Sequence, residues 1–401
     1  MGLMHYNGWG VKQDYNEAFK WYNRAAGQNY VLAQLMLGVM QYKNEDYSEA
    51  AKWYSKAAEQ GNVWAQLELG LMYENGKGVM QDKSEAFKWY SKAAEQGQAN
   101  AQFILGRMYE NGDGVVQNKP KAAKWYSQSA EQGIPGAQYN LANMYYKGDG
   151  VRQDFSEAFK LYSKLAEHED ADAQFMMGLM YEKGEGVKQD IYEAAKLYIK
   201  AKAQGYAKAQ CKIGDMYYNG TGMPQSNSEA LKCYTQAAEQ GLAEAQFKLG
   251  GMYYHGEGML WGSKSEAFNW YSKAAEQGHA KAQFNVGVMY AKGEGVRQNN
   301  QEALKWYRMA AEQGLVEAQY NIGLMYHEGE GVRQDYPEAL KWFHKAAEQG
   351  DGLAQYNLGH MYYSGEGVRR NQSEAVIWWR KAAQQGDKNA QSALKKLGET
   401  W

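Results

Sequence analysis

The dipeptide Ala-Gln recurs through the chain at a nearly constant spacing. The second copy follows the first after 32 residues, and the later copies follow at steps of 36 residues, with a single step of 37. The repeated glutamines are Gln34, Gln66, Gln102, Gln138, Gln174, Gln210, Gln246, Gln283, Gln319, Gln355 and Gln391. A fixed period of this length indicates one supersecondary unit stacked many times, rather than several independent globular domains.

Each unit carries the apolar spacing of two helices. In the unit that begins at Gly61, the first helix, called helix A here, is marked by residues at i, i+4, i+7 and i+8, which share one helical face. These are Ala65, Leu69, Met72 and Tyr73. A Gly-x-Gly-Val loop follows, and a similar spacing then predicts a second helix, helix B. Its apolar residues are Ala86, Trp89, Tyr90, Ala93 and Ala94.

Polar and glycine residues mark the expected ends of helix B. Asp82 stands three residues before Glu85, the pattern of a capping box, in which the Asp side chain accepts from a free N–H of the first turn. Gly97 follows the helix, where a left-handed residue ends a helix at the lowest conformational cost. Both markers recur in most units, which supports the assignment of two helices to each.

Composition excludes several classes of protein. The 44 Lys and Arg residues nearly balance the 46 Asp and Glu residues, whereas nucleic-acid-binding proteins usually carry a basic surface and a high pI. No stretch approaches the roughly 20 apolar residues that span a bilayer. We therefore predict no nucleic-acid partner and no membrane insertion.

At these motifs the chain resembles the Sel1-like repeat family, relatives of the tetratricopeptide repeats with a longer loop between the two helices. The motifs Ala-Gln-x-x-Leu-Gly-x-Met-Tyr, Gly-x-Gly-Val and Glu-Ala-x-Lys-Trp-Tyr-x-Lys-Ala-Ala-Glu-Gln-Gly occur together, in register, along essentially the whole chain. The resemblance implies an all-α fold, a right-handed superhelical solenoid of antiparallel helix pairs with about eleven repeats. It also implies that helix A lines the concave side of a binding scaffold, and it names no ligand.

The predicted boundaries treat residues 1–401 as one solenoid. Residues 1–30 form a first repeat that looks truncated, because Met1-Gly2-Leu3-Met4 aligns with the middle of helix A in a later unit. Residues 31–386 hold the full repeats, and residues 387–401 hold a C-terminal capping helix. With a shortened helix A, helix B of the first repeat is expected to expose apolar surface at Phe19 and Tyr22, a possible route to self-association.

The candidate partner-binding groove follows from columns of helix A that lie off its buried face. The column directly after Ala-Gln is rich in aromatic residues, and columns further along each helix vary in charge. The selected residues are Phe103, Arg107, Tyr139, Asn143, Phe175, Asp215, Phe247, Phe284, Tyr320, His327, Tyr356 and His360. Two interpretations stay open: the aromatic rings grip a partner, or they pack between neighbouring A helices.

The sequence offers little support for catalysis, and we predict no catalytic, cofactor-binding or metal-binding residue. Gly-x-Gly-Val follows a helix and lacks the further residues of phosphate loops. The favoured function is a non-enzymatic scaffold for a protein or peptide. One alternative is a bacterial immunity or inhibitor protein that blocks a toxin or effector. A remote alternative, from Ser392-Ala-Leu-Lys395, is a cell-wall or β-lactam hydrolase.

Cellular compartment and cysteine chemistry stay open at this level. A cytoplasmic location fits the chain as it stands, and a periplasmic or secreted location would apply if a signal peptide precedes it. Cys211 and Cys233 fall on helices A and B of one unit, so a bridge is conceivable. In the cysteine-rich branch of the family the cysteines occupy other columns, which favours two free, buried thiols here.

Overall fold

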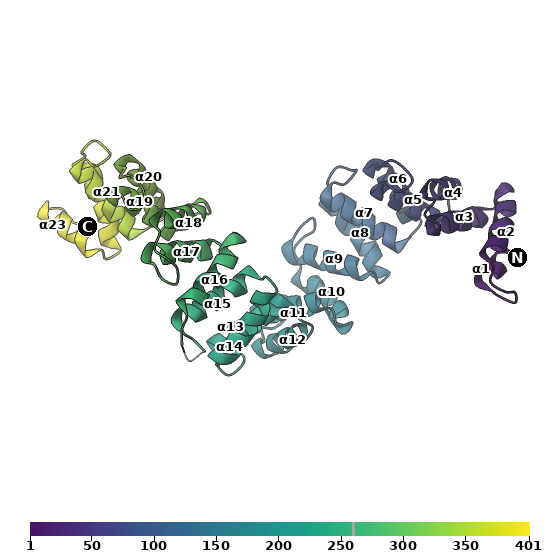
Figure 1. The fold of residues 1–401 in the computed structure, drawn as a ribbon, viewed down its shortest axis with the longest axis horizontal. Helices are drawn as coiled ribbons and strands as arrows, with labels where there is room; N and C mark the ends of the chain where they lie inside the picture. The colour runs from purple at the N-terminus through teal and green to yellow at the C-terminus, as the bar shows by residue number, and fades with distance from the viewer. Residues whose placement is uncertain (259–260) are drawn as a thin grey trace. The chain divides into compact units, whose positions relative to one another are not determined.

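The computed structural model describes residues 1–258 and 261–401, and these residues form 23 α-helices and no β-strand (Figure 1). The A helices are α1 (Gly2–Asn7), α3 (Val31–Lys43), α5 (Val63–Asn75), α7 (Ala99–Asn111), α9 (Pro135–Lys147), α11 (Ala171–Lys183), α13 (Ala207–Asn219), α15 (Ala243–His255), α17 (Ala280–Lys292), α19 (Val316–Glu328), α21 (Gly352–Ser364) and α23 (Lys388–Lys396). The B helices are α2 (Tyr15–Gly27), α4 (Tyr47–Glu59), α6 (Lys83–Glu95), α8 (Lys119–Glu131), α10 (Phe155–Glu167), α12 (Ile191–Ala203), α14 (Asn227–Glu239), α16 (Lys264–Glu276), α18 (Asn300–Glu312), α20 (Tyr336–Glu348) and α22 (Gln372–Gln384).

Two compact units divide the chain, Met1–Ala194 and Ala195–Trp401. Consecutive helices pack against one another from α1 through α11 in the first unit and from α13 through α23 in the second. The predicted all-α solenoid of stacked helix pairs is therefore confirmed. Helix α12 contains the boundary between the two units.

The expected helix ends are also confirmed. The Asp82 carboxylate accepts hydrogen bonds from the backbone N–H groups of Ser84 and Glu85, at 2.8 and 3.1 Å. Gly97 has a left-handed φ of +87°. Both features help to satisfy the first N–H groups and the last carbonyls of a helix, which have no partner within the helix.

The repeated glutamine is buried and joins three helices. The Gln283 side chain on α17 is 5% exposed; its amide donates to the carbonyl of Ala275 on the preceding B helix at 3.1 Å. Its carbonyl oxygen accepts a bond of 2.8 Å from Gln313, the residue that ends the following B helix. Bonds of this second kind, 2.6–2.8 Å long, recur along the chain. They pair Gln60 with Gln34, Gln96 with Gln66, Gln132 with Gln102, Gln240 with Gln210, Gln277 with Gln246, Gln349 with Gln319, and Gln385 with Gln355.

A glycine in most of the A helices admits the aromatic ring of helix B. A Cβ atom built on Gly70 would lie 2.7 Å from the ring of Tyr90, and one on Gly287 would lie 2.6 Å from the ring of Tyr307. Tyr90 is fully buried and Tyr307 is 4% exposed. The small residue thus sets how closely helices A and B approach, and the ring fills the space between them.

The N-terminal repeat corrects one expectation. Tyr22 is 6% exposed, because its ring lies against Gly2 of α1, where an added Cβ would come within 2.8 Å. The prediction that Tyr22 is exposed was therefore wrong, while Phe19 is half-buried. Exposed apolar side chains near this end include Met1, Leu3 and Trp9. Self-association through them stays a prediction.

Replacing Gln283 with alanine should lower the free energy of unfolding by about 2 kcal/mol, because the Gln313 amide and the Ala275 carbonyl then lose their common partner inside the protein. Urea unfolding followed by far-UV circular dichroism measures the change. Gln236→Ala, at an exposed position of α14, is the control and should change stability by less than about 0.5 kcal/mol. Equal effects for the two variants would show that the buried amide contributes no special stability.

A second pair of variants separates backbone conformation from steric contact. Gly97 and Gly114 both have positive φ, but a Cβ on Gly97 meets nothing within 4 Å, whereas one on Gly114 would lie 2.2 Å from the Lys83 carbonyl oxygen. Gly97→Ala should lower the free energy of unfolding by about 1 kcal/mol, because alanine disfavours the positive φ of this position. Gly114→Ala should lower the free energy of unfolding by about 3 kcal/mol, because the added methyl group also forces the loop away from the first residue of α6. The same unfolding assay tests this, and similar costs would refute the steric role of Gly114.

Candidate functional site

The candidate residues occupy fixed positions on the A helices, counted from the repeated glutamine. We call the side chains at positions +1, +2, +5 and +8 the helix-A face. Position +1 holds most of the aromatic candidates, position +5 holds Arg107, Asn143, Asp215 and His360, and position +8 holds His327. Position +2 was not selected from the sequence.

The aromatic rings at position +1 pack between helices. The Phe103 ring centre lies 5.9 Å from that of Tyr126 on α8, and a Cβ on Gly136 of the next A helix would come within 2.9 Å of the Phe103 ring. Equivalent ring pairs join Tyr139 to Tyr162, Phe247 to Tyr271, Phe284 to Tyr307, and Tyr320 to Phe343, at 5.6–5.9 Å. Phe175 is buried, at 8% exposure, and the other candidate rings are half-buried. Partner contact at these rings stays a prediction.

Polar side chains at positions +5 and +8 meet the hydroxyl groups of the buried B-helix tyrosines. Tyr162 donates to Asn143 at 2.8 Å, and Tyr234 donates to Asp215 at 2.7 Å. At position +8, Glu74 accepts from Tyr90 at 2.7 Å, and Glu110 accepts from Tyr126 at 2.6 Å. Hydrogen bonds from the buried tyrosines therefore hold these polar side chains of the helix-A face in place.

Other bonds link the faces of successive repeats. Arg107 donates to Glu74 of the preceding repeat at 2.8 Å. His327 lies 3.0 Å from Glu366 in the loop of the next repeat, and His360 lies 3.7 Å from the same carboxylate. The structure thus brings His327 and His360 together around one acid. Among residues 1–258 and 261–401, no group of three or more His, Cys, Asp or Glu side chains is placed to hold a metal ion.

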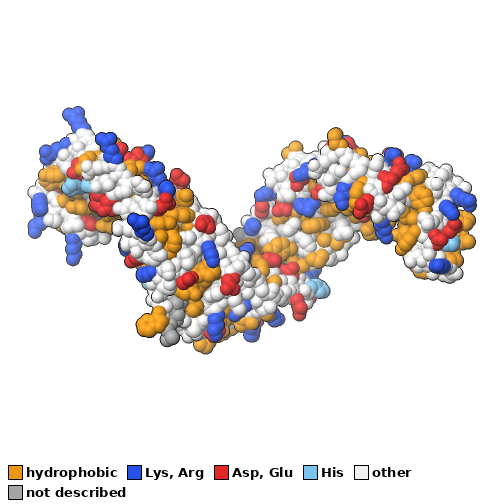
Figure 2. Space-filling model, in the orientation of Figure 1, with side chains coloured by type: hydrophobic (Ala, Val, Ile, Leu, Met, Phe, Trp, Pro, Cys, Tyr) orange, Lys and Arg blue, Asp and Glu red, His pale blue; other side chains and the backbone are white. Residues whose placement is uncertain are grey.

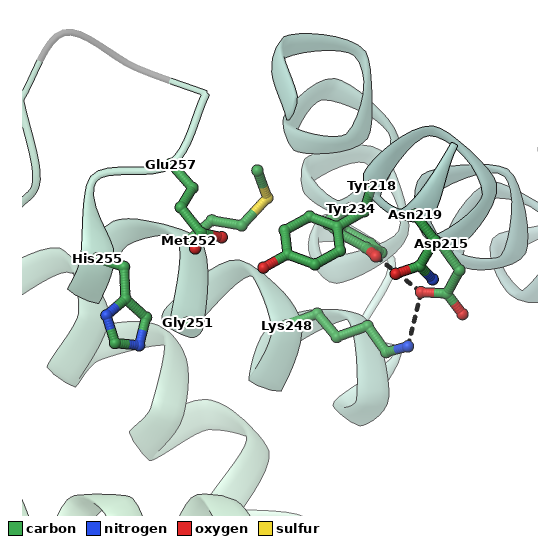
Figure 3. A pocket seen from close by; sticks show the side chains of 9 residues that line it. All are labelled: Asp215, Tyr218, Asn219, Tyr234, Lys248, Gly251, Met252, His255 and Glu257. Carbon is green, nitrogen blue, oxygen red and sulfur yellow. Dashed lines mark hydrogen bonds and ion pairs between the residues drawn. The ribbon is translucent and has the colours of Figure 1, made fainter. Parts of the chain in front are cut away.

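A pocket of about 350 Å³ opens between α13 and α15 in the second unit (Figure 3). Asp215 lies at one end, where Tyr234 and Lys248 both point at its carboxylate; Lys248 Nζ lies 2.6 Å from Oδ1. At the other end, the Tyr218 hydroxyl points toward Glu257. The lining residues are Asp215, Tyr218, Asn219, Tyr234, Lys248, Gly251, Met252, His255 and Glu257.

Charge in this region is organised around Lys248. Burial lowers the pKa of Lys248, but the hydrogen bond and attraction to Asp215 outweigh burial, so the net pKa is raised and the amine stays charged. The hydrogen bond from His279 is the largest cause that lowers the pKa of Glu244, to about 2, and Lys248 adds to it. Burial raises the pKa of the Cys211 thiol to about 12. Cys211 and Cys233 are both free and buried, as expected.

Two further pockets lie on the helix-A face of the same unit. One, of about 190 Å³, is lined by Tyr254, His255, Tyr271, Phe284, Asn285, Val288 and Met289. The other, of about 300 Å³, is lined by Tyr356, His360, Tyr363, Trp379, Asn389, Ser392, Ala393, Lys396 and Leu397. The candidates Asp215, Phe284, Tyr356 and His360 therefore line pockets.

Sequence reasoning missed position +2, which contributes Lys248 and Asn285 to two of the pockets. Position +2 lies three residues before position +5, and this i, i+3 spacing puts both on one helical face. That spacing was the signal available in the sequence. Glu257, from a loop, had no such signal. None of the described helices is long and apolar enough to cross a bilayer.

Comparisons with known proteins agree with the repeat pattern. The model of the Sel1 repeat family matches residues 1–30, 31–62, 65–98, 99–134, 135–170, 171–206, 207–242, 243–279, 280–315, 316–351 and 352–387. A solved protective antigen present in uropathogenic Escherichia coli strains, described as displaying an SLR fold, is 38% identical; the match covers 94% of this chain and 82% of that one, with a TM-score of 0.72. A Sel1 repeat protein from Oxalobacter formigenes is 35% identical, with 77% and 89% covered and a TM-score of 0.57.

A weaker likeness links the chain to an immunity protein from Pseudomonas aeruginosa, which is 23% identical, with 54% of this chain and 81% of that one covered and a TM-score of 0.37. No curated protein sequence matches the chain.

The charge cluster predicts a pH dependence. Because the pKa of Glu244 is about 2 in the folded protein and ordinarily 4.5, its ionised form stabilises the fold above pH 4.5, and this contribution is lost as the pH falls toward 2. The Glu244 side chain is 53% exposed, so solvent screening limits the effect to about 1 kcal/mol. Glu244→Gln should therefore destabilise the protein near neutral pH and flatten its acid unfolding curve. Glu276→Gln, on an exposed position, is the control, and matching curves for the two variants would contradict the assignment.

Proposed function

Because this chain belongs to the Sel1 repeat family, whose members generally act as scaffolds for protein interactions, we propose that it is a non-enzymatic scaffold that binds a protein or peptide along its helix-A face. The observation that supports this best is the series of three pockets on the helix-A face of the second unit. Each pocket combines aromatic side chains with polar groups, the composition from which protein interfaces draw affinity and specificity.

The fixed positions of polar groups on the helix-A face support a binding role. Asp215 is held by Tyr234 and Lys248, and Glu74 is held by Tyr90 and Arg107. Side chains fixed in this way lose little conformational entropy when a partner binds, because their rotamers are already set. The charged side chains are paired with one another, which suits a surface that positions a partner.

The aromatic candidates near the C-terminal end of the second unit provide the test. Tyr320 is half-buried, and Tyr356 lines the pocket that also holds His360. Replacing both tyrosines with alanine should weaken partner binding by at least about tenfold, the effect expected for the loss of aromatic anchors. Affinity capture from lysate of the source cells, with mass spectrometry, identifies the partner, and calorimetry measures the change.

Tyr192→Ala is the matched control, because Tyr192 lies on a B helix and is 67% exposed. Far-UV circular dichroism of each variant reports loss of folding. Capture of a bacterial toxin as the partner would identify the chain as an immunity protein. If the folded Tyr320/Tyr356 double variant bound the partner normally, the helix-A face would not be the binding site.

A further inference from the structure

The second repeat, residues 31–62, lacks the Gly-x-Gly loop that the other repeats place between helices A and B. Only the three residues 44–46 connect α3 to α4, whereas the seven residues 184–190 connect α11 to α12. The second repeat is therefore four residues shorter at this point, and the segment that it lacks is the loop itself.

Elsewhere in the chain the loop covers the beginning of helix B in the preceding repeat. A Cβ atom on Gly186 would lie 2.5 Å from the carbonyl oxygen of Phe155, the first residue of α10. The corresponding glycines come within 2.1–2.6 Å of the first residue of the preceding B helix; they are Gly78, Gly114, Gly150, Gly258, Gly295, Gly331 and Gly367. Tyr15, the first residue of α2, has no such cover and is 54% exposed.

A pocket of about 460 Å³ lies in the first unit where the loop is missing. Its lining includes Tyr15 at the beginning of α2, Lys43 at the end of α3, and Tyr6 of α1. A volume of this size is typical of pockets that hold ligands. None of the residues that line it belongs to the three pockets of the second unit.

The repeat of residues 171–206 shows what the loop contributes when it is present. Lys183, at the end of α11, donates to the hydroxyl of Tyr146 at 3.2 Å, and this hydroxyl donates to the loop carboxylate of Glu185 at 2.6 Å. Lys183 Nζ also lies 3.7 Å from the Glu185 carboxylate. The Phe155 ring packs edge-on against Tyr146, with 5.4 Å between the ring centres. A lysine, a tyrosine and a carboxylate thus meet beside the aromatic ring that begins helix B.

The pocket repeats this arrangement without the carboxylate. Lys43 and Lys183 both lie nine residues after the repeated glutamine, and Lys43 donates to the Tyr6 hydroxyl at 2.8 Å. The Tyr6 and Tyr15 rings are again edge-on, with 5.4 Å between their centres. The hydrogen bond to Tyr6 raises the pKa of Lys43, so its amine is charged at neutral pH. In the part of the chain that the structure describes, Lys43 has no carboxylate at ion-pair distance, and the Tyr6 O–H has no acceptor.

We propose that this pocket binds an acidic loop of a protein partner, which takes the place of the loop that the second repeat lacks. The carboxylate of a Glu or Asp side chain accepts from Lys43 and from the Tyr6 O–H, as Glu185 does in the chain's own loop. The backbone of the partner's loop covers Tyr15. A second copy of the chain is a poor source of this loop, because its loops are packed on their own B helices. The site goes beyond the proposed function and involves other residues.

A display library of disulfide-cyclised peptides supplies the probe. The library is first depleted on a grafted chain, in which residues 184–190 replace residues 44–46 so that a loop fills the pocket, and is then selected on the wild-type chain. The best binder is synthesised with an amidated C-terminus, and fluorescence anisotropy measures its affinity. We expect it to contain a Glu or Asp whose replacement by the corresponding amide weakens binding at least about tenfold, from the loss of a charge-assisted hydrogen bond.

Lys43→Gln tests the protein side of the same contact. This variant should also bind the peptide at least about tenfold more weakly, and the two losses should not add when both changes are combined, since they remove one interaction. Lys183→Gln is the matched control, because Lys183 has the same position in a repeat that supplies its own carboxylate. Circular dichroism monitors the fold of each variant.

The grafted chain provides a readout that needs no peptide. A graft that retains the glutamate corresponding to Glu185 should unfold at a higher urea concentration than a graft with glutamine in its place, because only the carboxylate can pair with Lys43. Equal midpoints for the two folded grafts would show that the pocket does not hold a carboxylate.

Three binding results would also overturn the proposal. They are a library that yields no binder after depletion on the grafted chain, a best binder that needs no acidic side chain or fails once its C-terminus is amidated, and undiminished binding by the folded Lys43→Gln variant. The proposed helix-A face is tested through Tyr320 and Tyr356, so its outcome is independent of these results.

Discussion

The buried glutamine amide is the interaction on which the rest of the structure depends. In Gln283 it donates to the carbonyl of the preceding B helix and accepts from the residue that ends the following one. A buried amide costs free energy unless its donor and acceptor are both used, so the bond to each neighbour is required. Within each unit the same amide recurs in register, so most helix pairs are joined to their neighbours through the same bonds.

The tyrosine of helix B connects the core to the helix-A face. Its ring fits against a glycine of helix A, and its hydroxyl emerges on the helix-A face, where Asp215, Asn143 or Glu74 accepts it. Bonds such as Lys248 to Asp215 then join one repeat to the next. The candidate site is therefore an extension of the packing, and variation in a few side chains changes its chemistry without changing its geometry.

Much of the fold was predictable because its determinants are local. Helix periodicity, the N-cap at Asp82 and the left-handed Gly97 each depend on a few neighbouring residues, and the structure has all of them. The site was less predictable. Position +1 was selected for its aromatic residues, yet these rings are half-buried or buried among helices. Tyr22 was expected on the surface, but its cover comes from a six-residue helix whose beginning has no sequence marker.

The sequence by itself determined the number of repeats, the helices and much of the core, because a strict period lets one unit predict the others. It also assigned the chain to its family, since three motifs recur in fixed register. Only the tertiary structure decided which side chains of successive repeats meet. Lys248 lies 33 residues from Asp215, and His327 lies 39 residues from Glu366. Contacts at such separations depend on how one helix pair sits on the next, and the spacing of residues within a single repeat does not contain that relation.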